Sequence, residues 1–300
     1  MTGAAEPTRS GFVALAGRPN AGKSTLVNAV VGEKVAIVSD RPQTTRRAIR
    51  GVAAGDGWQL VLVDLPGVQR PRDALTERMA RRVQRELSEA DAALVVLNGE
   101  EGVGGPGDRF IAGTLRDAGV PVVLAVNKMD RLDRARAAAA LTSASELVPD
   151  AEVFPISART GSGVDELVRH LTTLLPAGPY WFAPGESSDQ PEPVVVAELI
   201  REQVLRRAHQ EVPHAVEVKV DDIDRSRDDL VRITAHAWVE TESQKAILIG
   251  AGGRMVKAVG TAARRELERR YGQRVHLDLN VRVRKRWRAD DDLLDRLGID

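Results

Sequence analysis

Apolar runs alternate with helix-like segments over the first half of the chain. The runs read FVALAG, WQLVLVDLPG, AALVVLN, PVVLAVNKMD and EVFPIS, and the helix-like segments between them cover residues 24–32, 76–89, 108–118 and 164–175. Each run is apolar along nearly its whole length, which is typical of strands buried on both faces of a parallel sheet. Strands that alternate with helices in this way predict an α/β fold with a doubly wound sheet.

One pair of strands should depart from the parallel arrangement. The stretch RAIRGVAAGDGWQLVLVD places two strand-like runs on either side of Gly55-Asp56-Gly57. Closely spaced Gly and Asp residues between two such runs favour the tight turn of a hairpin. We therefore expect a mixed sheet in which one edge strand runs antiparallel to its neighbour.

The pattern changes after residue 175. The stretch PAGPYWFAPGESSDQPEPVVV is rich in Pro, Gly, Ser and acidic residues, which oppose helices and central strands. Beyond it follow a helix, two strands, a helix ending near Gly250, a second helix and a last strand, in the order α-β-β-α-α-β. We therefore divide the chain into a disordered N-terminal tail (1–10), a nucleotide-binding domain (11–178), a linker (179–197) and a smaller α+β domain (198–300).

Composition excludes several classes of protein. The chain has 300 residues, of which 43% are hydrophobic and none is cysteine, so it can build real cores but no disulfide framework. The first residues lack the apolar core of a signal peptide, and no apolar run approaches the roughly 18–20 residues of a membrane span. We expect a soluble cytoplasmic protein.

Charge is balanced over the whole chain but not along it. Lys and Arg together number 43, as do Asp and Glu, whereas residues 245–288 hold thirteen basic residues and only three acidic ones, Glu266, Glu268 and Asp278. A basic block of this density indicates a surface for a polyanion. The alternative is that these arginines merely coat the solvent face of a helix, as in ARRELERR.

The stretch GRPNAGKS fits the phosphate-binding pattern G-x-x-x-x-G-K-[ST], after a strand and before a helix. Successive backbone N–H groups can then point at phosphates from the positive end of the helix. Lys23 would neutralise charge on the β- and γ-phosphates, and Ser24 would offer its hydroxyl to Mg²⁺. The residues predicted to contact nucleotide here are Gly17, Arg18, Pro19, Asn20, Ala21, Gly22, Lys23, Ser24 and Thr25.

The base is indicated by NKMD, which ends the strand PVVLAV, where open α/β sheets place ligands. The Asp130 carboxylate can accept hydrogen bonds from N1–H and N2–H₂ of guanine, whereas adenine has neither donor, so discrimination should be large. Lys128 can lie along the base, Asn127 can orient neighbouring loops, and the Ala158 N–H can meet guanine O6. The predicted base-binding residues are Asn127, Lys128, Met129, Asp130, Ser157, Ala158 and Arg159.

Two further segments lie between these motifs. Asp64 of DLPG is suited to hold Mg²⁺ through water, and the Gly67 N–H to contact the γ-phosphate. In QTTR a threonine can complete the Mg²⁺ shell only when γ-phosphate is present, which makes that loop a switch, and we favour Thr45 over Thr44. The predicted catalytic residues are Lys23, Thr45, Asp64 and Gly67, the Mg²⁺ ligands Ser24, Thr45 and Asp64, and the further nucleotide contacts Thr44, Leu65, Pro66 and Val68.

Together these motifs resemble the translation-factor-like GTPases, and the Era group within them. The resemblance implies GTP binding, hydrolysis to GDP, and two mobile switch loops. Val68 stands where the Ras group carries a water-positioning glutamine, so slow intrinsic hydrolysis is expected. Related GTPases that modify tRNA use an asparagine at the position of Asn20 to bind K⁺, so K⁺ is a second candidate cofactor. The alternative is that Asn20 only caps the loop through hydrogen bonds.

A second glycine-rich stretch, ILIGAGGRMVK, places the pattern G-x-x-G between two helices. Within an α-β-β-α-α-β unit it resembles a type II KH domain, whose loop clamps the backbone of single-stranded nucleic acid. Lys245, Arg254 and Lys257 would contact phosphates, and apolar neighbours (Ile247, Ile249, Met255, Val256) would line a groove for bases. The predicted RNA contacts are Lys245, Ile249, Gly250, Ala251, Gly252, Gly253, Arg254, Met255 and Lys257. The alternative is an ordinary glycine turn in a helical hairpin.

The domain order resembles that of the Era group over nearly the whole chain. By resemblance, the partner is the 3′ region of 16S ribosomal RNA, the role is in assembly of the small ribosomal subunit, and no DNA is expected. Two departures stand out: Gly252 replaces a usual lysine, and the linker lacks the usual basic run. The rival reading is a GTP-regulated module that meets a protein or, peripherally, a membrane surface with its basic block.

Overall fold

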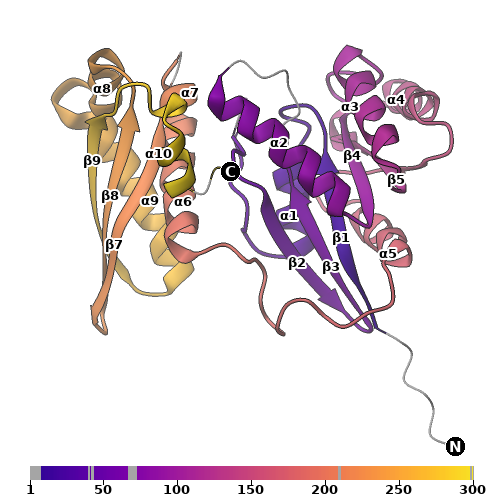
Figure 1. The fold of residues 1–300 in the computed structure, drawn as a ribbon, viewed down its shortest axis with the longest axis horizontal. Helices are drawn as coiled ribbons and strands as arrows, with labels where there is room; N and C mark the ends of the chain where they lie inside the picture. The colour runs from indigo at the N-terminus through magenta and orange to yellow at the C-terminus, as the bar shows by residue number, and fades with distance from the viewer. Residues whose placement is uncertain are drawn as a thin grey trace, which may run out of the picture. The chain divides into compact units, whose positions relative to one another are not determined.

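The computed structural model describes residues 8–39, 41, 44–66, 73–208, 211–297 and 299, without the side chains of 116–118. The chain divides into two compact units (Figure 1). The first comprises Met1–Ala36, Thr45–Pro71 and Arg78–Asp189, and the second comprises Ile37–Thr44, Arg72–Glu77 and Gln190–Asp300. The division after Asp189 falls inside the predicted linker of 179–197.

A six-stranded sheet forms the centre of the first unit, in the order β2-β3-β1-β4-β5-β6. Only β2 runs antiparallel to its neighbour, and the other adjacent strands are parallel. The strands are β1 (Arg9–Ala16), β2 (Ile49–Gly55), β3 (Trp58–Asp64), β4 (Ala92–Asn98), β5 (Val122–Asn127) and β6 (Glu152–Pro155). The predicted mixed sheet and the hairpin turn are therefore confirmed, and Gly57 takes the positive φ of 76° that the turn requires.

Helices cover both faces of this sheet. Buried residues of α1 and α5 join one apolar cluster with β1, β3 and β4, and those of α2, α3 and α4 join a second cluster on the other face. The helices are α1 (Lys23–Val31), α2 (Ala74–Glu89), α3 (Pro106–Ala118), α4 (Arg134–Leu147) and α5 (Val164–Leu174). Sequence reasoning missed α4, because RARAAAALTSASEL buries only alanines, Ala140 and Ala144, and so shows little apolar periodicity.

The ends of this unit are more ordered than expected. Strand β1 begins at Arg9, inside the predicted tail of 1–10, and Ser10 is buried. Beyond residue 178 the chain stays on the first unit, since Gln59 Oε1 accepts hydrogen bonds from the N–H groups of Trp181 (2.8 Å) and Phe182 (3.0 Å). The Trp181 ring lies 5.5 Å from that of Phe12, centroid to centroid. Trp181 therefore anchors the segment that leaves the first unit.

The second unit is a three-stranded sheet, in the order β7-β8-β9, that carries its helices on an apolar core. Strands β7 and β8 are antiparallel, and β8 and β9 are parallel. The elements are α6 (Glu192–Arg207), α7 (Val212–Ala215), β7 (Glu217–Arg227), β8 (Leu230–Val239), α8 (Glu242–Ile249), η2 (Ala251–Gly253), α9 (Arg254–Tyr271), β9 (Arg274–Val283), η3 (Trp287–Ala289) and α10 (Asp291–Arg296).

The predicted order α-β-β-α-α-β is present in this unit. Helix α6 begins at Glu192, within the stretch predicted as linker, because Pro191 and Pro193 stand at positions that a first helical turn tolerates. The two small helices α7 and α10 were not predicted, and the buried Trp287 ties this region together by donating to the Ala215 carbonyl at 2.8 Å. Among the described residues, no helix is both long enough and apolar enough to cross a bilayer.

Candidate functional site

The loop between β1 and α1 has the geometry of a phosphate cradle. Gly22 takes a left-handed φ of 96°, and a Cβ atom there would lie 2.2 Å from Asn127 Nδ2, so only glycine fits. Asn20 is also left-handed, with a φ of 61°, a conformation that asparagine tolerates better than most residues. Helix α1 follows directly and has no side-chain cap among the described residues, so its first N–H groups can face a ligand.

The Lys23 side chain is held by backbone carbonyls of the same loop. Lys23 is buried, and its Nζ donates to the carbonyls of Gly17 (3.1 Å) and Arg18 (3.3 Å). Burial lowers the pKa of Lys23, and the nearby negative charge of Asp64 opposes that shift. A bound phosphate would add a second negative charge beside Lys23 and favour its ammonium form.

Three of the predicted metal-binding side chains meet at one point. Ser24 Oγ donates to Asp64 Oδ2 at 2.6 Å, and Thr45 Oγ1 lies 3.3 Å from Ser24 Oγ and 3.4 Å from Asp64 Oδ2. Thr44 turns elsewhere, since its hydroxyl donates to the Arg41 carbonyl at 2.6 Å. The geometry therefore supports Thr45, the favoured of the two threonines.

Asp64 itself is incompletely satisfied. It is fully buried, and its Oδ1 atom has no hydrogen-bond partner within the described part of the chain. Burial raises the pKa of Asp64, against the opposing effects of Lys23 and of the Ser24 hydroxyl. An unpartnered buried carboxylate oxygen is costly, so this atom is suited to a cation or its bound water.

Asn127 connects three motifs through one buried amide. Its Nδ2 donates to the Ala21 carbonyl at 2.8 Å, and its Oδ1 accepts from the N–H groups of Lys128 (2.8 Å) and Ala158 (2.9 Å). The role predicted for Asn127, orienting neighbouring loops, matches these contacts. The Ala158 N–H, predicted to meet guanine O6, donates to Asn127 here.

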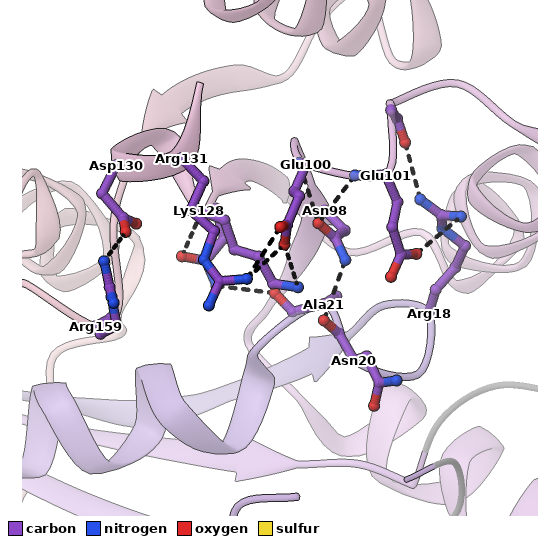
Figure 2. Close-up of polar contacts among 12 residues, drawn as sticks. Arg18, Asn20, Ala21, Asn98, Glu100, Glu101, Lys128, Asp130, Arg131 and Arg159 are labelled. Atoms are coloured by element: carbon purple, nitrogen blue, oxygen red, sulfur yellow. Dashed lines mark hydrogen bonds and ion pairs between the residues drawn. The ribbon is translucent and has the colours of Figure 1, made fainter. Parts of the chain in front are cut away.

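Asp130 is held by the loop that follows β6. Ser157 Oγ donates to its Oδ1 at 2.6 Å, and Arg159 Nη2 contacts its Oδ2 at 2.5 Å. These donors, Ser157 first, lower the pKa of Asp130, so the side chain is an acceptor at neutral pH. Figure 2 shows Arg159 and Asp130 facing each other.

Sequence analysis assigned no role to the stretch NGEEG (98–102), which the structure connects to both motifs. Asn98 ends β4 and donates from its Nδ2 to the Asn20 carbonyl at 3.2 Å. Glu100 forms ion pairs with Lys128 (3.3 Å) and Arg131 (2.8 Å). Figure 2 shows these contacts joining the phosphate loop to the base-binding motif. The sequence feature that could have indicated these residues is the position of Asn98 at the end of its strand, like Asn127 at the end of the next one. Adjacent parallel strands end at the same edge of the sheet, where ligands bind.

The Arg18 side chain belongs to the same network and turns away from the cradle. Its Nη2 donates to the Gly102 carbonyl at 2.8 Å, and it forms ion pairs with Asp108 (2.9 Å) and Glu101 (3.7 Å). Its predicted contact with nucleotide would therefore come from its backbone. Gly67 and Val68, predicted at the γ-phosphate, lie outside the described residues.

The second glycine loop has the form predicted for it. Helix α8 ends at Ile249, and Gly250, Gly252 and Gly253 all take positive φ, at 72°, 59° and 76°. A Cβ atom on Gly250 would lie 2.8 Å from Met255 Cβ, whereas Gly252 and Gly253 border open space. Helix α9 then begins at Arg254 with no side-chain cap among the described residues. Exposed N–H groups at a helix start favour a phosphate.

The side chains around this loop fall into two kinds. Arg254 and Lys257 are exposed, and Lys245 is half-buried beside Glu242. Ile247 and Met255 pack against the core of the unit, and Ile249 and Val256 are half-buried. A basic surface therefore borders an apolar one at the glycine loop.

Known proteins share this pairing of sites. Residues 12–128 match a family described as 50S ribosome-binding GTPase, and residues 211–288 match one described as KH domain. GTPase Era of Mycobacterium tuberculosis (strain ATCC 25618 / H37Rv) is 46% identical over 295 residues, which cover 96% of this chain and 98% of that protein. The chain belongs to the Era family of GTPases.

Solved structures of Era have the same fold. The structure of Era in complex with MgGDPNP and nucleotides 1506–1542 of 16S ribosomal RNA is 32% identical, with a TM-score of 0.93, and the match covers 97% of this chain and 99% of that one. An Aquifex aeolicus Era variant bound to GDP.AlF4⁻ is also 32% identical, with a TM-score of 0.92 and the same coverage. The predicted GTPase domain and the smaller KH domain are thus confirmed, and the chain is a GTPase.

Proposed function

We propose that this Era-family GTPase binds the 3′ region of 16S ribosomal RNA through its KH domain and acts in small-subunit assembly in the cytoplasm. The observation that carries the proposal is the glycine loop at 250–253, whose positive φ values and open space leave room for a nucleic-acid backbone. The basic block of 245–288 supplies complementary charge. The relative solved with 16S nucleotides supports the choice of RNA.

Magnesium is the metal that suits the nucleotide site. Ser24, Thr45 and Asp64 would hold it, directly or through water, and the unpartnered Asp64 Oδ1 fits a hard cation. When bound, Mg²⁺ supplies positive charge to the β- and γ-phosphates. Lys23 and the N–H groups at the start of α1 would orient the same phosphates. The relative solved with MgGDPNP supports this assignment.

Potassium is a second candidate cofactor of the nucleotide site. Asn20 lies in the phosphate loop, where its amide oxygen is a candidate K⁺ ligand, and its left-handed φ of 61° is an independent reason for asparagine there. Hydrolysis rates measured at equal concentrations of KCl and NaCl separate the two roles. Faster turnover in KCl that is lost in Asn20→Ala supports a K⁺ site, and equal rates in the two salts refute it.

The RNA proposal is tested by binding of an oligonucleotide that corresponds to nucleotides 1506–1542 of 16S ribosomal RNA. Gly253→Asp places a negative charge in the loop and should weaken RNA binding at least tenfold, because the carboxylate repels the phosphates. Gly178→Asp introduces the same charge in the first unit at a position with open space, and should leave RNA binding unchanged. Wild-type affinity in Gly253→Asp would refute the proposal. Vesicle binding that survives in that variant would favour the membrane-surface alternative.

A further inference from the structure

The carboxylate that reads guanine already has a donor on each of its oxygens. Ser157 occupies Asp130 Oδ1 at 2.6 Å and Arg159 occupies Oδ2 at 2.5 Å. The two donors differ in freedom, because Ser157 is buried whereas the Arg159 side chain is 66% exposed and Asp130 is 15% exposed. Arg159 can therefore leave the carboxylate at little structural cost, and Ser157 cannot.

Guanine needs the same acceptors. Its N1–H and its 2-amino group lie side by side and meet the two oxygens of one carboxylate, much as two N–H groups of a guanidinium do. We propose that guanine places its N1–H on Oδ1, where Ser157 leaves the second lone pair free, and its 2-amino group on Oδ2. The bulkier guanidinium of Arg159 must then leave Oδ2, so Arg159 competes with the base and tunes specificity at that position. Ser157 then serves to orient Asp130, and Arg159 is the part that moves.

Comparing hypoxanthine with guanine nucleotides distinguishes this competition from a general effect of the Arg159 charge. That base keeps N1–H but lacks the 2-amino group, so an inosine nucleotide leaves Asp130 Oδ2 to Arg159. A guanine nucleotide must instead displace the guanidinium. Arg159 thus weakens guanine binding and does not change hypoxanthine binding, which lowers the ratio of guanine affinity to hypoxanthine affinity. An exposed ion pair of this kind is worth roughly a two- to fivefold change in affinity.

The test measures GDP and IDP affinities by competition against a fluorescent nucleotide, with diphosphates used so that hydrolysis does not interfere. In Arg159→Ala we expect GDP to bind about two- to fivefold more tightly and IDP to bind as in the wild type. Arg159→Met should behave in the same way, because its side chain has a similar length and no hydrogen-bond donor. Equal melting temperatures would show that both variants fold.

Arg131→Ala is the matched control. It removes a positive charge from the same region, but Arg131 pairs with Glu100 and not with Asp130, so the ratio of GDP to IDP affinity should not change. Raising the salt concentration should move the wild-type ratio toward that of Arg159→Ala, since salt screens the exposed pair. Weaker GDP binding in Arg159→Ala would overturn the proposal by showing that Arg159 supports the base. Equal shifts for GDP and IDP would overturn it as well, because they indicate only long-range charge.

Discussion

The substitution Asp130→Asn should change which purine this GTPase binds. Asparagine keeps one acceptor oxygen but replaces the other with an NH₂ group, which would face the 2-amino group of guanine donor to donor. Xanthine carries a carbonyl oxygen at that position and should pair with the new amide. The variant is therefore expected to lose guanine nucleotides and gain xanthine nucleotides.

The size of the effect follows from the contacts of Asp130. Losing the hydrogen bond from the 2-amino group to an ionised acceptor costs about 1.5–3 kcal/mol, and leaving two donors facing each other unpaired costs about 1–3 kcal/mol more. GDP affinity should therefore fall roughly 10²- to 10⁴-fold. The protein itself should lose little, because Ser157 can still donate to the asparagine carbonyl and Arg159 is 66% exposed. A change of at most about 1 kcal/mol in the free energy of unfolding is expected from losing that surface ion pair.

Competition titrations with GDP, XDP and ADP provide the assay, with urea unfolding as the control for folding. The prediction is a reversal of preference from GDP to XDP, with ADP weak in both proteins. A folded variant that still prefers GDP would show that Asp130 does not read the base. If ADP bound the wild type as tightly as GDP does, the claim that Asp130 selects guanine over adenine would be refuted.

Three further predictions concern other parts of the two sites. Asn127→Ala removes three hydrogen bonds, two of them buried, and should lower the free energy of unfolding by about 2–4 kcal/mol in urea titrations, with a parallel loss of GDP affinity. An unchanged urea midpoint would contradict the connecting role of this amide. Gly250→Ala should lower the melting temperature because of its positive φ and the close Met255, whereas Gly260→Ala, within α9 and facing open space, should raise stability by about 0.5–1 kcal/mol; equal effects would refute the strain argument. Because burial raises the pKa of Asp64, its contribution to stability without metal is present at low pH and is lost as the pH rises through that raised pKa. Mg²⁺ binding needs the ionised carboxylate, so the rise in melting temperature that Mg²⁺ induces should shrink on acidification. Asp64→Asn should lose this pH dependence.

Much of the nucleotide site could be predicted because its chemistry is local. The phosphate loop requires particular residues in consecutive positions, so GRPNAGKS identifies it without any long-range contact. Asp130 and Ser157 were predicted for the same reason, as each lies in a short motif that follows a strand. The choice of Thr45 over Thr44 rested on a weaker argument, and the structure supports it through the distances to Ser24 and Asp64.

The parts that escaped prediction depend on contacts between distant segments. Glu100 looks like a solvated loop residue in the sequence, and its pairing with Lys128 and Arg131 exists only because β4 and β5 end side by side. Helix α4 was missed because alanines pack against the sheet without the apolar periodicity that marks other helices. The competition between Arg159 and the base follows from side-chain positions that no spacing in the sequence reveals.

Crosslinking of the protein to RNA in living cells, followed by sequencing of the bound fragments, tests the central claim most directly. The account predicts that fragments from the 3′ end of 16S ribosomal RNA dominate for the wild type and disappear for Gly253→Asp. A fragment population without ribosomal RNA, or one that Gly253→Asp leaves unchanged, would contradict it.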